Sequence, residues 1–307
     1  MTQIEVLTPA LTTIGESALW DVETERLWWI DIFGHAIFRA TAEGRELRVW
    51  SLPSRPSSFA LCADGDRAII TSGSRIAFLD LETTELEVVF DADVERAGFN
   101  DGTVDRQGRF VTGLADHDLM EPATFDRVGT TEPRGRLYRV DGDRTSHDLG
   151  QPIGMSNGPC FSPDGTTLYW GDSWSRVVHA FDYEPATGLT TNPRVLVQFH
   201  GDSPAAVTAV PDGATVDAEG GIWVAACYGS EIRRYAPDGT LDRRLPVPVV
   251  SPTSVAFGGP DLDTLFVTSI GDATLPGGLH RAGPLAGTIL AVHGLGVRGI
   301  PETRFAG

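Results

Sequence analysis

Cysteine is scarce in this chain of 307 residues, and its three copies, Cys62, Cys160 and Cys227, lie far apart. None belongs to a Cys-x-x-Cys pair, so the sequence predicts neither a disulfide framework nor a thiolate zinc site. Long hydrophobic runs are missing too, because no stretch reaches the roughly 18 apolar residues of a membrane-spanning helix. The segment MTQIEVLTPALTTIGES lacks the basic start and apolar run of a signal peptide, and we therefore expect a cytoplasmic protein.

Positive charge is also in short supply. The chain has 24 Lys and Arg residues against 42 Asp and Glu residues, which gives a formal net charge of −18 at pH 7. This charge repels the phosphates of nucleic acids and anionic lipid surfaces, so we expect neither nucleic acid nor a membrane as a partner. The same excess also favours solubility, and 41% hydrophobic residues is ordinary for a globular protein with a full core.

Two signatures of hydrolytic chemistry are absent. Ser17, Ser156 and Ser173 do not lie in a Gly-x-Ser-x-Gly elbow, which argues against a serine nucleophile. The seven His residues show no paired spacing typical of a zinc site. Long apolar patterns with a 3.6-residue period are missing as well, so strands are expected in place of helices.

What the sequence does contain is a repeated pattern of a polar residue, a short apolar run, a turn with Asp and Gly, and a second apolar run. The turns ADGD, RQGR, SPDG and AEGG are typical of β-hairpins. The repeats begin at Glu16, Ser58, Asn100, Asn157, Asp212 and Thr253. Their starts lie 42, 42, 57, 55 and 41 residues apart, a spacing typical of propeller blades.

We therefore predict an all-β fold, a six-bladed β-propeller of four-stranded antiparallel blades, in a single domain over residues 1–307. The segment IEVLTP near the N-terminus is available to complete the last blade. The two long intervals contain the polar segments 114–135 and 183–207, and a third segment, 271–287, interrupts the last blade. Each is either a lid or binding loop or a passive insertion.

The six polar residues that open the repeats should form a ring at one mouth of the central channel. Glu16 and Asp212 would place two carboxylates there without a Lys or Arg, and a divalent cation would relieve their repulsion. Asn100 and Asn157 add neutral amide oxygens, and this set suits calcium, magnesium or manganese, with zinc and iron(II) also possible. The alternative is that these polar residues merely form turns before strands.

Four segments carry a family resemblance: IGESALWDVETERLWWIDIFGHAIFR, FNDGTVDRQGRFVTG, SNGPCFSPDGTTLYWGDS and PDGATVDAEGGIWVAACYGSEIRRYAPDG. At these residues the chain resembles the senescence marker protein, regucalcin and gluconolactonase family of six-bladed propellers. The resemblance implies a metal-dependent lactonase that opens a sugar lactone or a related cyclic ester. It further implies that Glu16, Asn157 and Asp212 bind one divalent ion, that Asn100 contacts substrate, and that Asp212 is the general base.

The chain departs from this family at one position. Many members have an Arg two residues before the Asn of the Asn-Asp-Gly segment, whereas Gly98 stands there in RAGFNDG. Arg96 and His117, together with Asn100, are the candidate substrate-binding residues that remain, and gluconolactone itself becomes an uncertain substrate.

Two other function classes stay open at this point. A related propeller could use the same ion to cleave phosphoesters or organophosphates, and a calcium-binding propeller could have no catalytic activity at all. For the enzyme we expect a small-molecule lactone substrate and a monomer or small homo-oligomer. The ion would polarise the lactone carbonyl while Asp212 takes a proton from water, so the ligand and base roles of Asp212 compete.

Overall fold

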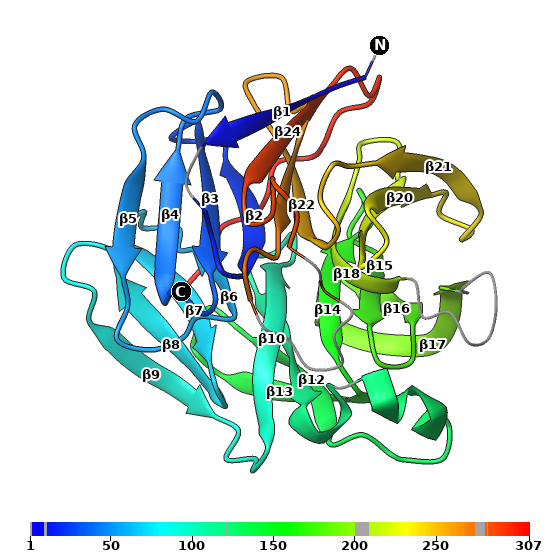
Figure 1. Ribbon diagram of the computed structural model, residues 1–307. Coiled ribbons are helices and arrows are strands. Elements are labelled where there is room, and N and C mark those ends of the chain that lie inside the picture. The colour runs from blue at the N-terminus through cyan, green and yellow to red at the C-terminus, as the bar shows by residue number, and fades with distance from the viewer. Residues whose placement is uncertain (1, 9–10, 121, 200–208, 274–279, 281) are drawn as a thin grey trace.

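Strands dominate the computed structural model, which describes residues 2–8, 11–120, 122–199, 209–273, 280 and 282–307. The strands of these residues form six four-stranded antiparallel sheets arranged around a central axis (Figure 1), which confirms the predicted six-bladed propeller. Within each blade, consecutive strands pair by hairpins, as the Asp and Gly turns of the sequence predict.

The first three blades follow one another along the chain. Blade 1 contains β2 (Gly15–Asp21), β3 (Arg26–Asp31), β4 (Ala36–Ala40) and β5 (Arg48–Ser51). Blade 2 contains β6 (Ser58–Leu61), β7 (Arg67–Ser72), β8 (Arg75–Asp80) and β9 (Leu86–Asp91). Blade 3 contains β10 (Ala97–Val104), β11 (Phe110–Asp116), β12 (Gly135–Val140) and β13 (Ser146–Ile153).

The other three blades complete the ring. Blade 4 contains β14 (Ser156–Phe161), β15 (Thr167–Asp172), β16 (Val177–Glu184) and β17 (Leu189–Gln198). Blade 5 contains β18 (Val210–Val216), β19 (Ile222–Cys227), β20 (Glu231–Tyr235) and β21 (Leu241–Pro246). Blade 6 contains β22 (Pro252–Gly258), β23 (Thr264–Ser269) and β24 (Ile289–His293), with β1 (Gln3–Thr8) as its outer strand.

The ring is closed by strands from opposite ends of the chain. β1 pairs antiparallel with β24, with Ile4 opposite Val292 and Val6 opposite Leu290. The N-terminal segment thus completes the last blade, as predicted. The C-terminal tail adds a second tie, because Phe305 is fully buried and exchanges backbone hydrogen bonds with blade 2, from Phe305 N to Leu61 O (2.8 Å) and from Ala63 N to Phe305 O (2.8 Å).

The hydrophobic cores lie between neighbouring blades, and successive residues of one strand contribute to different cores. Trp28 and Trp29 of β3 are both buried, and they point to opposite faces because strand side chains alternate. Trp28 packs in the core shared with Phe59 of blade 2, whereas Trp29 packs in the core shared with Phe266 of blade 6. The Trp-Trp pair therefore joins blade 1 to both of its neighbours.

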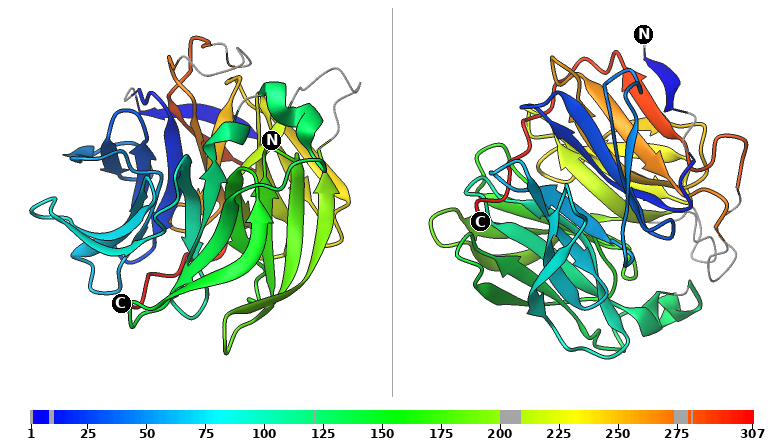
Figure 2. Two further views of the ribbon diagram at one scale, coloured as in Figure 1. Left: turned by 90° about the horizontal axis from the view of Figure 1, so that it is seen from below. Right: turned by 90° about the vertical axis from the view of Figure 1, so that its left-hand side faces the viewer.

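The segments predicted as extra loops have different structures. Segment 114–135 contains two short 3-10 helices, η1 (His117–Leu119) and η2 (Pro122–Arg127). Figure 2 shows these helical turns and the C-terminal tail at opposite faces of the propeller. Much of segment 183–207 is the β16–β17 hairpin, while residues 200–208, like 274–279 and 281 of the third segment, lie outside the described residues. No helix of the described chain is long and apolar enough to cross a membrane.

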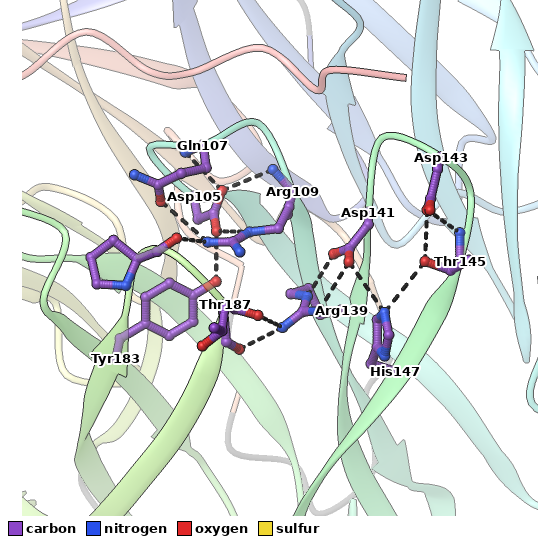
Figure 3. A network of polar contacts seen from close by, with 12 residues as sticks. Asp105, Gln107, Arg109, Arg139, Asp141, Asp143, Thr145, His147, Tyr183 and Thr187 are labelled. Atoms are coloured by element: carbon purple, nitrogen blue, oxygen red, sulfur yellow. Dashed lines mark hydrogen bonds and ion pairs between the residues drawn. The ribbon is translucent and has the colours of Figure 1, made fainter.

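A polar network joins blades 3 and 4 at the face that carries the C-terminal tail (Figure 3). Asp105, which is fully buried, accepts hydrogen bonds from Arg109 Nε (2.6 Å) and Tyr183 Oη (2.6 Å). Arg109 also donates to Pro185 O (2.7 Å), and Arg139 donates to Thr187 O (2.8 Å). These bonds cross from the hairpins of blade 3 to the β16–β17 turn, and they satisfy a carboxylate that would be costly to bury alone.

Replacing Tyr183 by Phe tests this network. The variant leaves one hydrogen bond of a buried carboxylate unmade, and we expect it to lower the free energy of unfolding by about 1–2 kcal/mol in urea denaturation. Tyr138→Phe is the matched control, because Tyr138 packs against Phe90 and Phe99 and its hydroxyl has no hydrogen-bond partner among the described residues. Equal stability losses in the two variants would show that the Tyr183–Asp105 bond contributes nothing.

Candidate functional site

A cavity of about 210 Å³ lies where the innermost strands of the six blades begin. Its lining includes five of the six residues predicted to form the ring: Glu16, Asn100, Asn157, Asp212 and Thr253. These residues come from five different blades and are remote along the chain. The propeller thus gathers two carboxylates and two amides around one space, as the repeat predicted.

β-Bulges in the innermost strands lie at the ring. In β2 the pairing register shifts directly after Glu16, and in β14 it shifts directly after Asn157. The residues that follow them, Ser17 and Gly158, have positive φ values of 50° and 51°. A bulge bends its strand and re-aims a side chain, so these backbones turn the ring residues to the cavity.

Blade 2 differs from the other five. Its innermost strand pairs with β7 without a bulge, and Ser58 bonds through its hydroxyl to Thr71 Oγ1 (2.8 Å). The lining residue is Ser57, so the ring position predicted at Ser58 was wrong by one residue. The spacing within each repeat identifies Ser57. Each ring residue lies four positions before an apolar residue of its blade's innermost strand, as Glu16 lies four positions before Trp20. In blade 2 the apolar residue is Leu61, and four positions before it is Ser57.

Hydrogen bonds fix the two ring amides. Asn157 Nδ2 donates to Ser173 Oγ (2.7 Å), and Asn157 Oδ1 accepts from Asn100 Nδ2 (2.9 Å). Asn100 Nδ2 also donates to the carbonyl oxygen of Ser156 (2.8 Å). A carbonyl oxygen has two lone pairs, so Asn157 Oδ1 keeps one lone pair available for a further partner in the cavity.

The two ring carboxylates are buried without a compensating charge. Glu16 and Asp212 are each only 8% exposed. Burial raises the pKa of Asp212 to about 8, and repulsion from Asp101 is the second cause. Burial also raises the pKa of Glu16 well above its usual range, with repulsion from Asp212 and Asp101 adding to the effect. No described cationic side chain offsets these shifts, so each carboxylate would be stabilised by a cation between them.

The donors present fit a hard divalent cation. Such ions prefer carboxylate and amide oxygens, which Glu16, Asp212 and Asn157 supply together. Within the described ranges, no group of three or more His, Cys, Asp or Glu side chains is placed to hold a metal ion. An ion bound at the ring would therefore depend on the neutral oxygen of Asn157 in addition to the two carboxylates.

Two aspartates that the sequence analysis did not predict bind the backbone directly before the ring residues. Asp31 Oδ1 accepts from the backbone N–H of Ile14 (3.0 Å), and Asp172 Oδ1 accepts from that of Met155 (2.8 Å). Ile14 and Met155 lie two residues before Glu16 and Asn157, so these bonds fix the backbone that carries the candidate ligands. The signal was an Asp at the end of the second strand of a blade, in WWID and LYWGD.

The candidate substrate-binding residues separate into two groups. Asn100 and His117 line the cavity. Arg96 is exposed, its guanidinium is bound to Asp118, and it is not among the lining residues. Strand alternation alone would place Arg96, four residues before Asn100, on the same face, but Arg96 precedes β10 and its positive φ of 58° breaks the alternation. We therefore do not retain Arg96 in the site.

His117 fills the space beside the glycine that departs from the family pattern. A Cβ atom on Gly98 would lie only 2.9 Å from His117 Nε2, so a larger residue at position 98 would displace the imidazole. Burial lowers the pKa of His117, and the positive charge of Arg55 lowers it further. His117 is therefore a neutral hydrogen-bonding group at neutral pH.

Comparison with known proteins agrees with this architecture. Residues 14–271 match the family described as the SMP-30/gluconolactonase/LRE-like region. The chain belongs to the SMP-30/gluconolactonase/LRE-like family. Among relatives in this family, it is 34% identical to regucalcin of Gallus gallus, with 96% of this chain and 95% of the relative covered. It is 33% identical to L-arabinolactonase of Azospirillum brasilense, with 87% and 84% covered.

A solved structure of the family extends the match to three dimensions. It is titled a calcium-binding protein, regucalcin, from Agrobacterium tumefaciens, and it superposes with a TM-score of 0.82 at 26% identity. The match covers 98% of this chain and 96% of that structure. The resemblance stated from the sequence motifs is thus confirmed at the level of family and fold.

The uncompensated carboxylates predict an unusual pH dependence of stability. An Asp whose pKa rises from 3.8 to about 8 on folding keeps a proton that the unfolded chain has lost. The contribution of Asp212 to stability is therefore greatest at low pH and is lost as the pH rises through this range. In metal-free protein we expect the Tm to fall by at least about 3 °C between pH 5 and pH 8.5, as measured by calorimetry.

A divalent ion should reverse this trend. Because its ligands bind in their deprotonated form, added ion should raise the Tm more at pH 8.5 than at pH 5. Asp212→Asn removes one of the two buried ring carboxylates and its repulsion of Glu16, and it serves as the control, in which the pH dependence should be flatter. A metal-free Tm that rises between these pH values would contradict the assignment.

Proposed function

We propose that this chain is a metal-dependent hydrolase that opens a lactone. The observation that carries the proposal is the pair of buried, uncompensated carboxylates, Glu16 and Asp212, beside the amide of Asn157 at a cavity. The relative named L-arabinolactonase and the structure titled as a calcium-binding protein support the reaction and the ion respectively. The substrate is thus a small cyclic ester that fits the cavity of about 210 Å³.

In this proposal Glu16, Asn157 and Asp212 hold one divalent ion. Held by these residues, such an ion would supply Lewis-acid polarisation of the ester carbonyl and would stabilise negative charge on its oxygen. The all-oxygen donor set favours calcium, magnesium or manganese, and zinc and iron(II) remain candidates for the reconstitution series. Asn100, whose amide nitrogen is already bound to Asn157 and Ser156, presents its carbonyl oxygen to a substrate hydroxyl or to water.

Asp212 is the proposed general base. One carboxylate oxygen accepts a proton as water attacks the carbonyl carbon, and the ring C–O bond then breaks. The proton passes to the alkoxide that leaves, so the product is a hydroxy acid and Asp212 is regenerated. Asp212 would serve both as a ligand and as the base, so the two roles of this carboxylate compete.

Asp212→Asn tests both roles. The amide keeps the shape of the side chain but cannot accept a proton as a base, so we expect kcat to fall by about a thousandfold or more. Loss of one anionic ligand should also weaken ion binding, which calorimetric titration of the metal-free protein measures. Asp66→Asn is the matched control, because Asp66 is an exposed carboxylate at the β6–β7 turn.

Three outcomes would contradict the proposal. A fully active Asp212→Asn variant would remove Asp212 from the mechanism. Ion binding without turnover on sugar and aliphatic lactones would instead indicate a calcium-binding propeller without activity, and turnover of phosphotriesters alone would indicate a phosphoester hydrolase.

A further inference from the structure

The wall of the cavity above the ring has its own pattern. Side chains two residues apart on a strand lie on the same face, so the residue two positions before each ring residue should also face the axis. Four of these positions are occupied by Ile14, Gly98, Met155 and Val210, and all four line the cavity. The equivalent residue in blade 2, two positions before Ser57, is Arg55, and it lines the cavity too.

Apart from Arg55, this level of the cavity is largely apolar. The segments that rise above the inner strands add Phe33, Phe125, Trp174 and Tyr228 to the lining, and β10 itself adds Phe99. Such a wall offers few partners to hydroxyl groups, and a hydroxyl buried without a hydrogen bond costs free energy. A substrate with hydroxyls on every carbon would leave several of them unsatisfied against this wall.

Arg55 is exposed where it lines the cavity, and it is not neutralised. Its guanidinium carbon lies 5.3 Å from the centroid of the partly exposed Phe33 ring, a cation–π contact. No described residue forms an ion pair or a side-chain hydrogen bond with it, in a chain of net charge −18 that contains no lysine. The neighbouring His117 is neutral, so Arg55 supplies the positive charge on this part of the wall.

We propose that Arg55 binds an anionic oxygen group of the substrate, so that the substrate is a lactone with a carboxylate substituent and an otherwise apolar body. The inference rests on the proposed function. A guanidinium presents two parallel N–H donors that match a carboxylate, and such pairs are stronger than neutral hydrogen bonds. The apolar wall then contacts the carbon skeleton, while the ester group faces the polar ring below.

The test compares a charged lactone with its neutral isostere. Protein reconstituted with the divalent ion that gives most turnover is assayed on 5-oxotetrahydrofuran-2-carboxylate, on the corresponding carboxamide and on D-glucono-δ-lactone. We expect kcat/KM for the carboxylate to exceed that for the carboxamide by on the order of 10- to 100-fold. Arg55→Gln should collapse this ratio toward one, whereas Arg45→Gln, at an exposed Arg paired with Glu43, should retain it.

Several results would overturn the inference. A ratio near one in the unaltered protein, a preference for gluconolactone, or an equal loss on both substrates in Arg55→Gln would each exclude a carboxylate subsite. These failures leave the proposed function intact, because neutral lactones would still be hydrolysed. If no lactone is hydrolysed, the proposed function fails. Calorimetric titration with the dicarboxylate product 2-hydroxyglutarate then still tests Arg55. We expect Arg55→Gln to weaken the binding of this dicarboxylate about tenfold or more.

Discussion

Repulsion and desolvation at Glu16 and Asp212 are the constraint on which the site depends. Two carboxylates in a largely buried cavity, with a third at Asp101, are unfavourable unless a cation or a proton compensates them. The surrounding structure holds them there nevertheless. Bulges turn the ring residues inward, and Asp31 and Asp172 hold the backbone directly before two of them. An arrangement that costs stability and is yet held this firmly is typical of a functional site.

The residues that destabilise the ring are different from the residues that stabilise the propeller. Stability comes from the cores between blades, to which the residues after the ring position contribute large apolar side chains, and from polar ties such as Asp105–Tyr183 at the opposite face. The ring position itself carries no part of a hydrophobic core. It can therefore be Glu, Ser, Asn, Asp or Thr in different blades without altering how the blades pack.

The sequence sufficed for the fold and for most of the ring, because both follow from the spacing of apolar runs and turns. It misplaced the blade 2 member by one residue, because β6 pairs without the bulge of the other five innermost strands, and Ser57 in place of Ser58 lines the cavity. Arg96 was misjudged because the direction of a side chain before a strand depends on local φ, and its positive φ directs it to Asp118. Arg55 was overlooked because it precedes its strand in a loop, and only the packed structure shows what such a residue faces.

The pairing of β1 with β24 has a consequence for biosynthesis. A ribosome makes β1 before every other strand of the propeller and β24 after them, so the ring stays open while the intervening blades emerge. Until blades 1 and 6 meet, Glu16 and Thr253 on the adjacent strands β2 and β22 are not held side by side. The proposed ion-binding ring can therefore assemble only after all six blades have been synthesised.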